Sequence, residues 1–418
     1  MYAEGVLVLT GIRGKNLAEV KRQNLESIKL ILYRRAPLSR VEIAEQLNLT
    51  PPTITNIVAE LIGQGVAQEL ASDSNAVNSH GIGRRPINVD LVSDFHYVLG
   101  ISLGRDFTRY CITDLRGNIR AQGEFELMSD DYTVMIHQLQ GILSVLMRRH
   151  SYEFGKMLGI GITVPGIVNS HTGVIKNHGT ERVSWRNQPL AQTISQFTGL
   201  PVRVENNVRA RACAISLFQP SLVGDEATFA LCHVSWGIAC PIVLGNRPFR
   251  GEGAAAGEIG KMILAPHAPS SPGFTMPGTL EALASVHAIL EQCKPLLSAK
   301  ENSELKKLCS DPEKLTINHI LEAQRKGDPA VCQIMDTSMF YVGIALANIV
   351  DIINPHLIFL SGEVFHNPEN IESVERSLLK HAFLPDDDPL KLVHASLGDY
   401  GGALGASACC IEKYFIRG

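Results

Sequence analysis

Residues 38–69, LSRVEIAEQLNLTPPTITNIVAELIGQGVAQE, decide the fold of the first part of this chain. Ser39, followed three residues later by Glu42, forms the capping box that opens a helix. The apolar residues of that helix recur at helical spacing: Val41, Ile43, Ala44 and Leu47. Thr50 and Pro51 then predict a second helix, with Thr50 as its N-cap and proline where its missing N–H costs nothing.

The second predicted helix has two distinct faces. Its apolar stripe consists of Ile54, Ile57, Val58, Leu61 and Ile62. The opposite side is small and polar, which lets a helix approach base edges in the major groove of DNA. The residues expected there are Thr50, Pro52, Thr53, Thr55 and Asn56. Arg40, at the start of the first helix, is expected to hold a phosphate; the alternative is a plain helical hairpin.

The residues after these helices predict a wing. Segments 66–70 and 87–91 have strand character and flank a Ser/Asn/Gly-rich loop. Arg84 and Arg85 lie at the end of that loop, where arginines can enter a minor groove or hold phosphates. Helices and wing together favour a winged helix-turn-helix over the hairpin.

A basic amphipathic helix is expected at 16–35, ahead of the helix-turn-helix. Its apolar side consists of Leu17, Val20, Leu25, Ile28, Ile31 and Leu32. Residues 1–15 are expected to form a flexible arm. We therefore place a DNA-binding domain at 16–92. Residues 1–92 carry 10 basic and 9 acidic residues, which suits a site-specific reader better than a general coat on nucleic acid.

Composition indicates an ordinary globular protein. The 418 residues are 45% hydrophobic and 19% charged, with a net charge of −4. We expect no apolar run near the roughly 18 residues needed to span a bilayer, and no signal peptide, so a cytoplasmic location is expected. None of the nine cysteines forms a C-x-x-C pair, so they are expected to be reduced core residues.

From Tyr97 onward the pattern changes to strands separated by helices, which predicts an α/β fold. Strands are expected at 97–103, 109–113, 119–127, 157–164, 201–205, 228–234, 239–244 and 357–360. Helices are expected at 133–150, 207–218, 279–293, 317–326, 330–353 and 401–415. We divide this region, 95–418, into a first lobe at about 95–226 with the helix 401–415, and a second lobe at about 227–400.

Several dispersed segments resemble the ROK family of repressors, open-reading-frame proteins and sugar kinases. They are GKNLAEVKRQN, LSRVEIAEQLNL, GRRP, PGIVNSHTGVI, PVRVENNVRA, GAAAGEIGK and VGIALANIVDIINPHLIFLSGEV. They occur in the family's order and span nearly all of the chain, as in its repressor branch. The resemblance implies a winged helix-turn-helix followed by a two-lobed, actin-like and hexokinase-like fold. In the family that fold binds ATP and a sugar between its lobes.

The resemblance implies a sugar pocket without a catalytic base. The family's Glu-Asn-Asp motif reads Glu205-Asn206-Asn207 here, and an amide cannot accept the proton that the aspartate removes. The sugar-binding residues implied are Asn206, Asn207, Glu258, Lys261 and Glu281. The alternative is that Glu258 and Glu281 only cap a turn and start a helix.

The family's ATP and zinc motifs are altered as well. Ser102 replaces the aspartate of the first phosphate loop, Trp236 and Pro241 interrupt the second, and Ser361-Gly362 replaces the late glycine pair. The zinc positions correspond to Lys261, Pro272, Phe274 and Thr279, with His267 alone nearby. We therefore expect no ATP, no metal and no other cofactor.

These observations predict a repressor of sugar metabolism genes rather than an enzyme. Its partners would be operator DNA and a small-molecule sugar effector, and palindromic operators favour a homodimer, or a tetramer. One alternative is control by a protein partner, such as a sugar-transport component. A sugar kinase with a regulatory front domain is the remaining alternative, and the altered motifs argue against it.

Overall fold

The computed structural model describes residues 16–418 except 71–86, 106, 127, 178–182, 225–227, 270–271, 275, 299–302, 385–389 and 396. The chain forms two compact units. The first, called the head, comprises Met1–Phe95 and Lys413–Gly418; the second, called the body, comprises His96–Glu412. The expected arm at 1–15 and the wing arginines, Arg84 and Arg85, lie outside the described residues.

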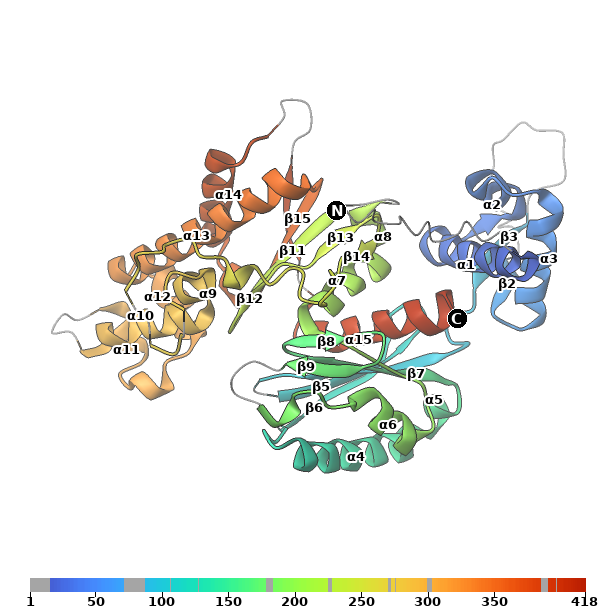
Figure 1. Ribbon diagram of the computed structural model, residues 1–418, viewed down its shortest axis with the longest axis horizontal. Helices are drawn as coiled ribbons and strands as arrows, with labels where there is room; N and C mark the ends of the chain where they lie inside the picture. The colour runs from blue at the N-terminus through green and yellow to red at the C-terminus, as the bar shows by residue number, and fades with distance from the viewer. Residues whose placement is uncertain are drawn as a thin grey trace, which may run out of the picture. The chain divides into compact units, whose positions relative to one another are not determined.

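The head combines three helices with a small antiparallel sheet (Figure 1). Its elements are α1 (Leu17–Arg35), β1 (Leu38–Ser39), α2 (Arg40–Leu47), α3 (Pro51–Gly63), β2 (Ala67–Leu70) and β3 (Asn88–Leu91). The strand order is β1-β3-β2, so the two expected wing strands are joined by a third. We did not expect β1, because two residues are too few to show a strand pattern. Leu38 pairs with Val89 and thereby anchors the wing beside α2.

The head has a continuous apolar core. Its fully buried residues include Ile28, Leu32, Ile43, Ile54, Val58, Leu61 and Val89. Three residues expected on apolar faces are instead exposed: Leu17, Val20 and Val41. Residues 16–22 are all exposed, so the first turns of α1 lie outside the core. Val41 lies about 200° around the helix from Ile43, since successive residues turn by about 100°.

The end of the chain belongs to the head. The expected helix 401–415 is α-helical only as α15 (Gly401–Ile411) and continues as a π-helical turn, Glu412–Ile416. The Lys29 ammonium donates to the Phe415 carbonyl at 2.9 Å and lies 5.3 Å from the centre of its ring. Burial lowers the pKa of Lys29. The chain therefore passes between head and body twice, after Phe95 and after Glu412.

The first lobe of the body contains a five-stranded sheet of order β10-β7-β4-β5-β6. The strands are β4 (Tyr97–Leu103), β5 (Phe107–Asp114), β6 (Ile119–Glu126), β7 (Met157–Val164) and β10 (Val202–Asn206). Figure 1 shows α4 (Tyr132–Arg149) and α6 (Leu190–Thr198) on one face, and α15 on the other. A Cβ at Gly100 or Gly161 would clash with the backbone of α15, so these glycines let that helix lie directly on the sheet.

Smaller elements complete this lobe. They are α5 (Ser151–Gly155), β8 (Ile167–Asn169), β9 (Val174–Asn177), η1 (Val183–Trp185), α7 (Asn207–Phe218) and α8 (Pro220–Val223). The start of α7 follows β10 without a loop, which places residues 205–207 at the carboxyl end of a buried strand. Ligand sites of α/β folds commonly lie at this edge of the sheet.

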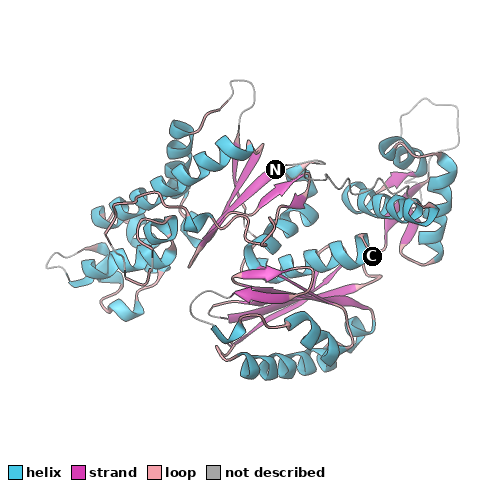
Figure 2. Ribbon diagram, viewed as in Figure 1, coloured by secondary structure: helices cyan, strands magenta, loops and turns pink. Residues whose placement is uncertain are grey.

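The second lobe contains a sheet of order β14-β13-β11-β15-β16, with β12 paired to β11. The strands are β11 (Phe229–Val234), β12 (Ile238–Ala239), β13 (Ile242–Leu244), β14 (Arg247–Pro248), β15 (Leu357–Ser361) and β16 (Lys391–His394). The strand expected at 239–244 is interrupted, because Pro241 has no N–H to donate to a sheet. Figure 2 shows helices gathered beside these strands.

The helices of the second lobe are α9 (Leu280–Ala284), α10 (Val286–Ser298), α11 (Glu304–Leu308), α12 (Ile317–Arg325), α13 (Pro329–Ile353) and α14 (Pro368–His381). Short helical turns lie at η2 (Ile259–Lys261), η3 (Pro312–Lys314) and η4 (Glu363–His366). The helix expected at 279–293 is two helices, because Ser285 has extended backbone angles.

One helix among the described residues, α13, is long and apolar enough to cross a membrane by length and composition. It is not an unbroken apolar run of the kind considered above, because polar residues such as Asp336 and Asn348 interrupt it. The helix is nevertheless part of the core of the second lobe, where Met335, Met339, Val342 and Leu346 are fully buried. A helix buried in a protein core can have the same length and composition, so these two properties alone do not indicate a membrane span.

Candidate functional site

The helix-turn-helix of the head forms as its caps predict. The Ser39 hydroxyl accepts from the Glu42 N–H at 3.3 Å, and the Ser39 N–H donates to the Glu42 carboxylate at 2.7 Å. These hydrogen bonds lower the pKa of Glu42. Asn48 ends α2 in the left-handed conformation, with a φ of 49°. Helix α2 is thus capped at both ends.

The start of α3 carries the residues expected to face DNA. Pro52, Thr55 and Asn56 are exposed and Thr53 is partly exposed. Thr50 is at the N-cap position as predicted, but its side chain makes no cap hydrogen bond. Its hydroxyl instead lies 2.9 Å from the Thr53 hydroxyl. Pro51 and Pro52 have no N–H, which leaves little at the helix start for a cap to accept.

Arg40 and Lys21 of the head are already paired with carboxylates of the head. Arg40 Nη2 lies 2.8 Å from Glu69 Oε1 on β2, and Lys21 Nζ lies 2.9 Å from Glu60 Oε2 on α3. Arg40 was expected to hold a phosphate, and in this structure Glu69 balances its charge. A DNA phosphate would have to compete with that carboxylate.

In the body, both polar atoms of the Asn206 side chain make hydrogen bonds to the backbone. Its Oδ1 accepts from the N–H groups of Val208 and Arg209, both at 3.0 Å, which caps α7. Its Nδ2 donates to the Gly166 carbonyl at 2.9 Å. Asn207 is partly exposed and its side chain makes no hydrogen bond to the described part of the chain. Of these two amides, Asn207 is the better placed to meet a ligand.

Glu205 is surrounded by arginines that the sequence did not single out. Its carboxylate is fully buried and lies 3.0 Å from both Arg209 Nη1 and Arg250 Nη2, and 3.6 Å from Arg203 Nη2. Burial alone would raise the pKa of Glu205, but the three guanidinium groups outweigh burial and hold the pKa below its usual value. Only the Glu205–Arg209 pair has a local signal, its helical spacing of four residues.

Arg209 also joins the lobes of the body. Its Nη2 donates to the carbonyls of Ala254 and Ala256, at 3.2 and 3.3 Å, in the loop that leads to Glu258. The start of α7 is thereby attached to the second lobe at the place where the sugar pocket is expected.

Glu258 differs from Glu205 because no described residue donates a hydrogen bond to its side chain. It precedes η2, but its carboxylate does not cap that turn. Burial raises the pKa of Glu258 and the charge of Glu281 raises it further, against the lowering effect of Arg209 and Lys261. A half-buried carboxylate without a donor is suited to accept hydrogen bonds from a ligand's hydroxyl groups.

Lys261 and Glu281 form an ion pair beside Glu258. Glu281 Oε1 also accepts from the Ile238 N–H at 3.4 Å. The structure thus brings Glu281 beside Glu258 and Lys261, although it lies 20 residues beyond Lys261 in the chain. Two carboxylates and one ammonium can accept from and donate to neighbouring hydroxyls, which is the chemistry a polyol requires.

The positions of the altered ATP loops are filled by side chains. Arg105 lies over the Trp236 ring, with its guanidinium carbon 3.6 Å from the ring centre. At the late glycine-pair position, the Ser361 hydroxyl lies 3.2 Å from His233 Nδ1. Burial, with Arg211 nearby, lowers the pKa of His233 to about 3, so this histidine is neutral. Phosphates of a nucleotide are bound by exposed backbone N–H groups of glycine-rich loops. The bulky side chains at these positions do not provide such a loop.

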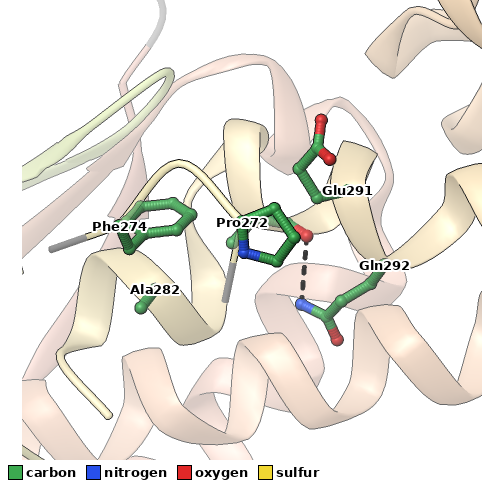
Figure 3. Close-up of a pocket in the computed structure, with 6 residues that line it drawn as sticks. Pro272, Phe274, Ala282, Glu291 and Gln292 are labelled. Carbon is green, nitrogen blue, oxygen red and sulfur yellow. Dashed lines mark hydrogen bonds between the residues drawn. The ribbon is translucent and has the colours of Figure 1, made fainter. Parts of the chain in front are cut away.

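The residues at the family's zinc positions do not form a metal site. Lys261 is paired with Glu281, and Thr279 caps α9 by accepting from the Ala282 N–H at 3.4 Å. Figure 3 shows Pro272 and Phe274 at a small pocket that is also lined by Ala282 of α9 and Gln292 of α10. Gln292 Nε2 donates to the Ala288 carbonyl at 3.2 Å. Within the part of the chain that the structure describes, no group of three His, Cys, Asp or Glu residues could hold a metal ion.

Known proteins resemble this chain over nearly its whole length. It is 24% identical over 396 residues to the xylose repressor of Bacillus spizizenii, covering 94% of this chain and 96% of that protein. It is 24% identical over 404 residues to the DNA-binding transcriptional dual regulator NagC of Escherichia coli, covering 96% and 95%.

A solved structure has the same fold. The crystal structure of a ROK family transcriptional regulator, a homologue of the E. coli MLC protein, matches with a TM-score of 0.81 and 25% identity. The match covers 94% of this chain and 97% of that one, so it includes the head as well as the body. The expected hexokinase-like fold with an N-terminal DNA-binding region is therefore confirmed. The ROK family model matches residues 98–413, and the chain belongs to the ROK family.

Proposed function

We propose that this protein is a transcriptional repressor of sugar metabolism genes that releases operator DNA when a sugar or sugar derivative binds between the lobes of the body. The observation that carries the proposal is Glu258: a half-buried carboxylate, next to Lys261 and Glu281, that no described residue satisfies. The same chain carries an exposed polar face at the start of α3. The named repressors among its relatives support the same function.

The residues of the pocket support binding without catalysis. Asn207 can donate to or accept from a hydroxyl, but it cannot take the hydroxyl's proton. Trp236 and Arg105 fill the position at which a kinase would hold phosphates. We therefore assign no kinase activity, no nucleotide and no metal to this protein.

The fold offers a route from the pocket to the head. Helix α15 lies on β4 and β7 and beside α7, whose first residues border the pocket, and its continuation enters the head at Lys413. A ligand that draws the lobes together would move α7, and the chain itself would carry that movement to the reading helices. In a homodimer whose half-sites are about 34 Å apart, a small rotation is sufficient to break the fit to DNA.

The coupling between the two ligands is reciprocal. The factor by which sugar weakens operator binding must equal the factor by which operator weakens sugar binding. Operator DNA and a small sugar are the partners we assign, and the cytoplasm is the location in which they would meet.

The test is thermal unfolding of the purified protein with a panel of hexoses, pentoses, N-acetylated sugars and sugar phosphates, and with ATP. A ligand at a hundredfold excess over its Kd stabilises a protein by about 2.7 kcal/mol, so the effector should raise the Tm clearly. ATP should not raise it. A rise with ATP alone would overturn the proposal in favour of a nucleotide-binding protein.

A further inference from the structure

Four side chains of the body form a continuous stack, which we call the aromatic column: Arg105, Trp236, His287 and Phe274. The Arg105 guanidinium lies 3.6 Å from the Trp236 ring centre, and the His287 ring lies parallel to the indole, at 4.4 Å and 10°. The Phe274 ring is 4.9 Å from His287 at an angle of 33°. Both faces of the indole are thereby covered.

The column is built from four separate segments. Arg105 comes from the loop between β4 and β5 in the first lobe, and Trp236 from the turn between β11 and β12 in the second. His287 is on the first turn of α10, and Phe274 belongs to the loop before α9. The Arg105–Trp236 contact therefore joins the two lobes of the body.

The turn that carries Trp236 also contacts Glu281, one of the proposed sugar-binding residues. The Ile238 N–H donates to Glu281 Oε1, and a Cβ added to Gly237 would lie 3.0 Å from the same oxygen. The Val286 N–H, at the start of α10, donates to the Ser235 carbonyl at 2.8 Å. Any displacement of the Trp236 turn would therefore displace Glu281.

We propose that the aromatic column holds Glu281 in the position that binds the sugar. Because Arg105 contacts Trp236 from the other lobe, the position of Glu281 depends on the distance between the lobes. A guanidinium is attracted to the negative face of an indole, and the contact can form and break without a covalent change. By the family resemblance, Arg105 and Trp236 lie in the two altered phosphate loops, and Phe274 lies at an altered zinc position. The column therefore connects, near Glu281, segments that phosphates and a metal ion would connect in other members of the family. Arg105 and Trp236 are positioning residues here, because they act through the turn at Ser235–Ile238.

The chain supplies its own probe of the column. It contains two tryptophans, Trp185 and Trp236, and Trp185 is fully buried in the first lobe. In the W185F variant, all tryptophan emission comes from Trp236. Removal of Arg105 uncovers one face of the indole, so R105A in this background should shift the emission. It should also increase quenching by acrylamide at least twofold, without any ligand present.

The ligand arm of the test rests on the proposed function. D-glucose, D-xylose and N-acetyl-D-glucosamine are titrated calorimetrically into the wild type and the variants. For any sugar that binds the wild type, R105A should raise the Kd about tenfold, R105K should restore part of the loss, and R148A, which removes an exposed arginine from α4, should change nothing. The Tm of R105A, R105K and R148A should remain within a few degrees of that of the parent protein, since Arg105 and Arg148 are exposed.

The possible outcomes test separately whether the aromatic column exists and whether it affects sugar binding. Unchanged quenching of Trp236 in R105A would overturn the column, whether or not a sugar is found. Changed quenching with an unchanged Kd would overturn the positioning of Glu281. If none of the three sugars binds the wild type, the same Kd comparison is made with the effector that the Tm panel identifies. If that panel also yields no sugar, the proposed function fails, and with it the positioning role.

Discussion

Two carboxylates of the body, Glu205 and Glu258, both interact with Arg209 but differ in every other respect. Glu205 is fully buried among three guanidinium groups, and its pKa is lowered. Glu258 is half-buried beside another carboxylate, and its pKa is raised. This difference distinguishes a carboxylate that maintains the fold from one that is suited to bind a ligand. The first has its ion-pair and hydrogen-bond partners within the chain, whereas no described residue donates a hydrogen bond to the second.

The largest effect should follow from E205Q, which preserves shape but removes the negative charge. Three buried or partly buried guanidinium groups then lose their counter-ion, and breaking such a network costs about 3–5 kcal/mol. Urea unfolding should show that loss, whereas E252Q, at an exposed position in the loop before Glu258, should cost almost nothing. A loss under 1 kcal/mol would show that Glu205 does not hold the arginines together.

The pH dependence should carry the same sign. Because the pKa of Glu205 is lower in the folded state, its stabilisation is present above the unfolded pKa, about 4.3, and is lost as the pH falls through the folded value. E205Q should therefore unfold with less dependence on pH below about 4 than the wild type.

The next effect concerns E258Q, for which binding and stability should change in opposite directions. Loss of a hydrogen bond to a charged group costs about 1.5–3 kcal/mol, so sugar affinity should fall roughly tenfold to a hundredfold. Without ligand, E258Q should be slightly more stable than the wild type at pH 7, because the folded state raises the pKa of Glu258 and disfavours its charged form. Calorimetry and urea unfolding measure the two effects; a destabilised variant with normal affinity would assign Glu258 to the fold.

The head also has one candidate DNA-binding side chain without a partner in the described chain and one that is already paired. Asn56 is exposed and its side chain makes no hydrogen bond to the described part of the chain, whereas Arg40 is paired with Glu69. N56A should weaken binding to the operator by about 1–3 kcal/mol and leave its salt dependence unchanged, as expected for a base contact. Q68A, at an exposed position on β2, is the matched control. Equal losses on operator and random DNA would place Asn56 on the phosphates instead.

The smallest effect should come from E69Q, which releases Arg40 from its ion pair. DNA affinity should then rise severalfold at low salt, and the slope of log K against log salt should steepen by about 0.9, the value for one added phosphate contact. Fluorescence anisotropy at several salt concentrations measures both. An unchanged slope would mean that Arg40 does not reach DNA.

Local signals in the sequence predicted most of the elements. The capping box at Ser39, the strands at 97–103 and 157–164 and the helix at 207–218 occur where expected. The errors have local causes too: β1 is too short to have a pattern, and Pro241 divides a strand that hydrophobicity alone would continue.

The candidate site was predictable only in part. Glu258, Lys261 and Glu281 were found through the family resemblance, and the structure brings them together. The contacts of Glu205 with Arg250 and of Trp236 with Arg105 could not be found, because Arg250 is 45 residues from Glu205 and Arg105 is still farther from Trp236. Neither pairing has a spacing that a sequence can display, and the same holds for Lys29 and Phe415.

The most direct test of the central claim is release of operator DNA by the sugar that stabilises the protein. A labelled operator is bound to the wild type and to E258Q, and the sugar is titrated while anisotropy is recorded. The account predicts that both proteins bind the operator equally without sugar and that the sugar releases the wild type at concentrations tenfold or more below those needed for E258Q. Equal release of both proteins, or tight binding that no sugar disturbs, would contradict it.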